Sequence, residues 1–125
     1  MGANSISGAS ATETLLASGA KTASGTTTAN AGFSGVHDLL VQLAVTAASG
    51  TGSPTLDVVI QHSIDDGTNW HDVAGLTFTQ VASASAPVAE LKLPTGTIAG
   101  TLRVKYTIAG TNPSFTFSVK AFARG

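Results

Sequence analysis

Alternation between apolar and polar residues is the feature that most limits what this chain can fold into. Between residues 102 and 108, every second position is apolar: Leu102, Val104, Tyr106 and Ile108. Successive side chains of a β-strand point to opposite faces, so this pattern predicts a strand with one face against a core. The same alternation recurs over residues 39–45, 56–60 and 115–119, and no window shows helical periodicity over three turns. The chain is therefore predicted to be all-β.

Turn-forming residues separate these apolar runs. Gly, Pro, Asn and Asp are concentrated at residues 49–54, 65–69 and 109–113. Turns that recur every 8–15 residues or so are typical of a β-sandwich or jelly roll. We therefore expect a single antiparallel sandwich of about seven to eight strands. The loop at 49–54 is expected to join its flanking runs as a hairpin.

Two details of the later strands can also be predicted. Gly75 should break or bulge the strand that contains it. In the strand over 88–93, Glu90 and Lys92 are expected to point outward. The predicted core consists of apolar residues from the alternating runs: Leu39, Val41, Leu43, Val58, Ile60, Leu102, Val104, Tyr106, Phe115 and Phe117.

The first 36 residues have a different composition, in which Gly, Ala, Ser and Thr predominate and the apolar residues Leu15, Leu16 and Phe33 are scattered. We expect residues 1–30 to form an extended N-terminal arm and residues 31–125 to form the sandwich domain. The arm is either flexible or ordered on a partner. A short strand over residues 13–17 is compatible with both, and its integration into the sandwich of the same chain is the competing outcome. The apolar side chains of the arm are candidate interface anchors: Ile6, Leu15 and Leu16.

Composition excludes several classes of function. The chain has six Lys and Arg against seven Asp and Glu, a formal net charge of −1, and no basic stripe for nucleic acid. Such a nearly neutral surface makes close packing among like subunits electrostatically easy. The absence of cysteine excludes disulfides and thiolate metal sites. No apolar stretch reaches transmembrane length, and the start of the chain lacks a signal-peptide pattern, so we expect assembly in a cytoplasm and no membrane partner.

No catalytic arrangement is visible among the few titratable residues. His37 and His71 each precede an aspartate, and neighbouring residues of a strand point to opposite faces. His62 continues the apolar face of Ile60, so it is expected to be partly buried. No HExxH, GxSxG or P-loop pattern occurs. The chain is therefore predicted to be no enzyme and to need no cofactor.

The acidic turn at residues 65–69 leaves two interpretations open. Asp65, Asp66 and Asn69 could supply oxygen ligands to Ca²⁺, but the spacing of an EF-hand loop is missing. We expect a structural turn in which Gly67 takes a positive φ. Trp70, directly after it, is a candidate interface aromatic, and its alternative role is packing over the sheet.

Several segments in a fixed order resemble a known family. They are 15–18, 21–25, 38–41, 45–47, 53–58, 60–63, 65–70, 78–81, 102–104 and 113–119. Together they resemble small virion structural proteins of tailed bacteriophages, over most of the chain from about Leu15 to Val119. That family has no catalytic residues to carry over.

Within that family we expect a capsid decoration (cement) protein that binds the outside of the phage head, because the chain is nearly neutral and small and has an extended arm. Its partners would be the major capsid protein or other virion proteins. Self-association as a homotrimer is expected, with the virion, assembled in the host cytoplasm, as its location. Two alternatives stay open: a tail, neck or fibre-associated structural subunit, and a carbohydrate- or receptor-binding module that uses Trp70.

Overall fold

The computed structural model describes residues 10–125 and is built almost entirely from β-strands. The all-β sandwich prediction is confirmed. The elements in chain order are β1 (Ser10–Lys21), β2 (Gly25–Thr26), β3 (Asp38–Ser63), β4 (His71–Thr77), β5 (Val81–Ala82), the 3-10 turn η1 (Ser83–Ser85), β6 (Val88–Lys92) and β7 (Thr101–Arg124).

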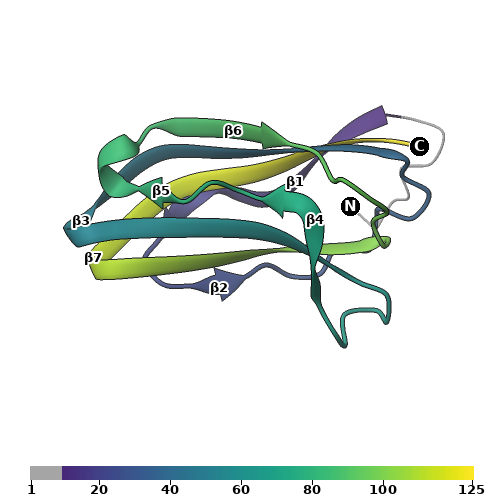
Figure 1. Cartoon of the computed structure of the whole chain (residues 1–125), viewed down its shortest axis with the longest axis horizontal. Coiled ribbons are helices and arrows are strands. Elements are labelled where there is room, and N and C mark those ends of the chain that lie inside the picture. Colours follow the sequence, from purple (N-terminus) through teal and green to yellow (C-terminus); the bar gives the residue numbers. More distant parts are fainter. Residues whose placement is uncertain (1–9) are drawn as a thin grey trace.

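The spine of the fold is the long antiparallel pair of β3 and β7 (Figure 1). The two strands pair along their whole length, from Asp38 with Arg124 to Ser63 with Thr101. Near its middle the pair folds back on itself, at 49–54 in β3 and at 110–113 in β7. A single sheet thereby becomes two layers. Layer A contains β1, the second half of β7, the first half of β3, and β6; layer B contains β2, the first half of β7, the second half of β3, β4 and β5.

Glycine makes the fold-over possible where the two strands turn together. Gly110 has φ +120° and Gly50 has φ +128°, a region that side chains strongly disfavour. A Cβ atom placed on Gly110 would lie 2.7 Å from the Cα of Pro54 on the other strand. The corner therefore needs a residue without a side chain at this position.

The hairpin predicted around residues 49–54 is wrong. Leu43 pairs with Val119, whereas Val58 pairs with Tyr106, so the two runs lie in different layers and pair with opposite halves of β7. Alternation shows which side chains share a face and says nothing about which strand is the neighbour. Both runs face the same core, and their patterns are therefore alike.

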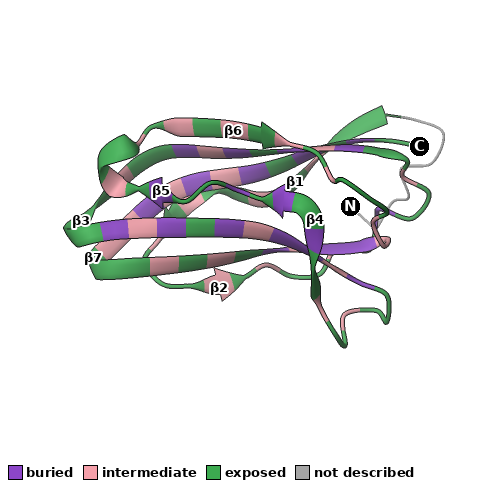
Figure 2. Ribbon diagram, viewed as in Figure 1, coloured by how far each residue is buried: buried purple, intermediate pink, exposed green. Residues whose placement is uncertain are grey.

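The core lies between the two layers (Figure 2). Nine of the ten predicted core residues are buried, and Tyr106 is partly buried. Phe33, which the predicted core did not include, is also fully buried. Its N–H donates to the carbonyl oxygen of Gly100 at 3.0 Å, which seats it over the end of the core.

Residues 10–30 follow β7 around the corner instead of leaving the domain. β1 pairs with the second half of β7 and β2 with its first half. The N–H of Thr27 donates to the carbonyl oxygen of Val104 at 2.9 Å, and Asn30 forms a bridge with Leu102. The expected boundary at residue 30 therefore does not separate an arm from the sandwich. Small residues suggested flexibility, but the backbone of this segment is hydrogen-bonded to β7, which composition cannot reveal.

The break expected at Gly75 is confirmed. The register between β3 and β4 shifts between Val59 and Gln61, and Gly75 itself has φ +89°. At this bulge the N–H of Thr95 donates to the carbonyl oxygen of Ala74 at 2.9 Å. The bulge thereby ties β4 to the segment that follows β6.

Candidate protein interface

β6 and the residue directly after it carry large apolar side chains on the solvent side. Leu91 is 59% exposed and Leu93 is 61% exposed. The sequence had predicted the opposite orientation, with Glu90 pointing outward. Glu90 pairs with the buried Leu43, so its side chain lies on the inner side of layer A. There its carboxylate accepts hydrogen bonds from the N–H and the hydroxyl of Thr79 in layer B, at 2.8 and 2.9 Å. The prediction for Glu90 is wrong because this contact between the layers sets the orientation of the strand.

Lys92 shares this inward orientation. It lies on the same side of β6 as Glu90, and its ammonium group is 3.8 Å from the Glu90 carboxylate. Its side chain keeps about a third of its exposure. The outward prediction for Lys92 is wrong for the same reason as for Glu90.

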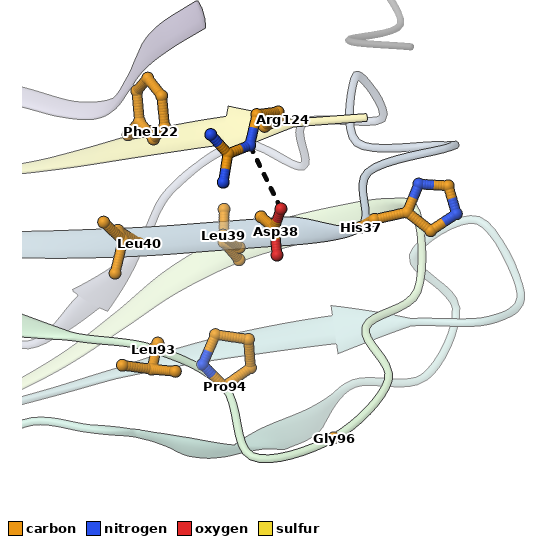
Figure 3. A pocket seen from close by; sticks show the side chains of 9 residues that line it. All are labelled: His37, Asp38, Leu39, Leu40, Leu93, Pro94, Gly96, Phe122 and Arg124. Carbon is orange, nitrogen blue, oxygen red and sulfur yellow. Dashed lines mark hydrogen bonds and ion pairs between the residues drawn. The ribbon is translucent and has the colours of Figure 1, made fainter. Parts of the chain in front are cut away.

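Four apolar side chains gather on the outer face of layer A, and we call them the outer apolar patch: Leu40, Leu91, Leu93 and Phe122. They come from three neighbouring strands, since Leu40 pairs with Phe122 and Gln42 pairs with Leu91. Figure 3 shows Leu40, Leu93 and Phe122 around a shallow depression that Pro94 also lines. A cluster of exposed apolar side chains on a sheet face is typical of a protein interaction surface.

Charges border the patch at its ends. The Nε of Arg124 donates to Oδ2 of Asp38 at 3.2 Å, and both side chains are more than 60% exposed (Figure 3). On the other side of the patch, Lys120 pairs in register with Gln42. Beyond this row the face continues with small residues: Ala44, Ala89 and Ser118. The face is thus apolar at its centre and almost neutral.

The interface residues predicted in the arm lie elsewhere. Leu15 and Leu16 belong to β1, are partly buried, and pack against the core of their own chain. The structure does not bring them to the outer apolar patch. Ile6 lies outside the described residues. The signal that could have located the patch was Leu91 and Leu93, whose alternation predicts one shared face but cannot tell the inner face from the outer one.

Trp70 is held on the outer face of layer B. Its Nε1 donates to the carbonyl oxygen of Gly67 at 3.1 Å, and the Arg103 guanidinium lies 4.4 Å from the ring centroid. The Nε of Arg103 in turn donates to Gln61 at 2.9 Å, and Gln61 donates to Asp72 at 2.9 Å. Trp70 is therefore packed into a polar row of its own domain, away from the patch on layer A.

The acidic turn is closed by its own hydrogen bonds. Oδ1 of Asp65 accepts from the Ser63 hydroxyl at 2.7 Å and from the Asn69 N–H at 2.9 Å, and Oδ2 accepts from the Asn69 side chain at 2.7 Å. The Asn69 donors, followed by Ser63, lower the pKa of Asp65 to about 2. Gly67 has the expected positive φ, +91°. Because donors occupy both carboxylate oxygens, the geometry favours a structural turn over a calcium loop.

Structural hydrogen bonds hold His62 and the aspartates that follow the other two histidines. Nδ1 of His62 accepts from the N–H of Ala99 at 3.0 Å, and the residue is partly buried, as expected. The aspartates that follow His37 and His71 are bound to Arg124 and Gln61. Neither carboxylate orients the histidine beside it. Among residues 10–125, no group of three or more His, Asp or Glu side chains could hold a metal ion.

Fold and surface together define a β-sandwich with exposed apolar side chains on the outer face of one layer. No protein-family model matches the chain, and no curated protein matches it in sequence. Within the described residues, no helix is long and apolar enough to cross a membrane.

Proposed function

We propose that this chain is a non-enzymatic structural subunit that binds other protein surfaces through the outer face of layer A. The exposure of Leu91 and Leu93 beside Leu40 and Phe122 carries this proposal. Fully burying a leucine side chain gains about 1.5–3 kcal/mol, so leaving two of them in water is costly for a free monomer. Their position on a hydrogen-bonded sheet means that a partner can cover them without any ordering of the chain.

The specific role we propose is that of a virion structural protein of a tailed bacteriophage, most specifically a decoration protein on the outside of the head. This role is supported by the sequence segments between Leu15 and Val119 that resemble the phage family and follow one another in the same order. The nearly neutral composition and the sandwich fold also support it. The partners would be the major capsid protein, other virion proteins and further copies of the chain. The trimer expected from the sequence is one arrangement of these copies, and a two-fold pair is another. The virion would be its location.

A tail, neck or fibre-associated subunit would use the same face. It would differ from a decoration protein only in its location in the virion. A carbohydrate-binding module is less well supported, because Arg103 covers one face of the Trp70 ring and the indole N–H is already bonded. A sugar usually stacks on a free aromatic face. The structure therefore favours protein binding over glycan binding.

The test is binding of the purified chain to particles assembled without it. Leu93→Ser and Leu91→Ser should each weaken binding at least tenfold. Ile64→Ser is the matched control, because Ile64 is 88% exposed and lies directly before the acidic turn, away from the patch. Binding that both leucine variants retain would overturn the assignment of this face. Binding to tails and not to heads would replace decoration by the tail-associated role.

A further inference from the structure

We propose that a second copy of the chain covers the outer apolar patch, related by a two-fold axis that runs parallel to the strands between β3 and β7. This inference rests on the assignment of the outer face of layer A to protein binding, and it names the immediate partner. A two-fold contact brings the same face of both copies together, so the face must be complementary to itself. The arrangement of charge and shape around the patch meets this requirement.

The charges select the direction of the axis. Asp38 on β3 and Arg124 on β7 pair side by side, and an axis between these strands exchanges the two strands. Arg124 of each copy then lies over Asp38 of the other, so that four charges alternate in sign. An axis across the strands would place β7 over β7 and bring Arg124 towards Lys120 of the other copy, which is repulsive. Electrostatic complementarity of this kind specifies the orientation of a complex.

The apolar residues fit the same axis. Phe122 of one copy lies over Leu40 of the other, because these two residues also pair across β7 and β3. The end of β6 lies over β1 of the other copy. Leu93 therefore meets the methyl group of Thr12, the residue of β1 that pairs with Phe122. Lys120 meets the uncharged Gln42. No like charges of these rows meet, and the small side chains further along the strands let the two faces approach.

The size of the face predicts a weak pair. Four strands spaced about 4.8 Å apart, each contributing residues that rise about 3.4 Å, make the face over residues 38–44 roughly 20 Å by 20 Å. A standard interface buries about 800 Å² on each partner, more than this face offers. We expect dissociation in the micromolar range, with pairing promoted where many copies are held close together.

The first experiment measures the mass of the full chain by sedimentation equilibrium from low micromolar to high micromolar concentration. A monomer–dimer equilibrium is expected, weakened at least tenfold by Leu93→Ser and unchanged by Ile64→Ser. A monomer at every concentration, or a trimer, would overturn the two-fold pair.

The second experiment tests the axis by charge reversal. Asp38→Arg and Arg124→Asp should each abolish self-pairing, because each places like charges over one another. Mixed together, the two variants should form a heterodimer, because both inter-copy pairs again have opposite signs. Thermal unfolding of each variant confirms that it is folded. A mixture that stays monomeric, or a single variant that still pairs, would exclude this axis.

The two proposals fail separately. A chain that binds particles through the patch but never pairs would remove the two-fold inference and leave the structural role. A chain that pairs through the patch but binds no virion component would remove the virion role and leave the pair.

Discussion

Tyr106 and Phe117 meet edge to face, with ring centroids 5.5 Å apart and planes at 75°, although both belong to β7. Eleven positions separate them, and the fold-over at 110–113 lies between them. An aromatic pair of this geometry adds about 0.5–1.5 kcal/mol beyond the area it buries. The contact between the two halves of one strand shows that the layers close on each other through the core.

Phe117→Ala should cost about 3–5 kcal/mol of unfolding free energy, because the ring is fully buried and its removal leaves a cavity beside Tyr106. Urea unfolding measures this loss. Phe122→Ala is the control on the same strand, since Phe122 is 38% exposed, and should cost roughly 1 kcal/mol or less. Equal losses for the two variants would show that the faces of β7 are misassigned.

Gly110→Ala should lower the free energy of unfolding by about 1–3 kcal/mol, because the new methyl group meets Pro54 and the backbone has positive φ. Gly96→Ala is the control, because a Cβ atom there has no neighbour within 4 Å. Thermal unfolding of both variants separates a specific effect of the corner from a general effect of replacing glycine. An unchanged midpoint for Gly110→Ala would contradict the described corner.

The stability of the acidic turn should depend on pH below about pH 4. Folding lowers the pKa of Asp65 from 3.8 to about 2, so the unfolded state binds the proton more tightly. The stabilising contribution is fully present above the unfolded pKa and is lost as the pH falls through the folded one. Thermal midpoints between pH 5 and pH 2 should therefore fall less steeply for Asp65→Asn than for the wild type. Parallel curves would show that the hydrogen bonds around Asp65 contribute nothing.

Deleting residues 2–21 should lower the thermal midpoint strongly or prevent folding. The deletion removes β1, exposes one edge of β7, and uncovers the core beside Leu15 and Leu16. Deletion of residues 2–9 is the control, because it removes none of the contacts described above. If the chain without β1 is folded and equally stable, residues 10–21 act as an arm and are not needed for the sandwich.

The sequence by itself determined which residues share a face. Alternation from Leu102 to Ile108 predicted strands and most of the core, and the Asp65–Asn69 turn was recognisable because its side chains bond their own backbone. Both signals are local. Local signals depend on chain geometry over a few residues, and distant contacts do not alter them.

Only the tertiary structure decided which strands are neighbours and which face of β6 meets water. The runs before and after residues 49–54 pair with different halves of β7, although their patterns are alike. Leu91 and Leu93 face outward because the pairing of Glu90 with Leu43 directs Glu90 towards Thr79. A shift of one residue in register would have reversed that strand without changing its pattern. Partner choice and register are set by contacts between residues far apart in the chain, and so the candidate interface became visible only in the folded protein.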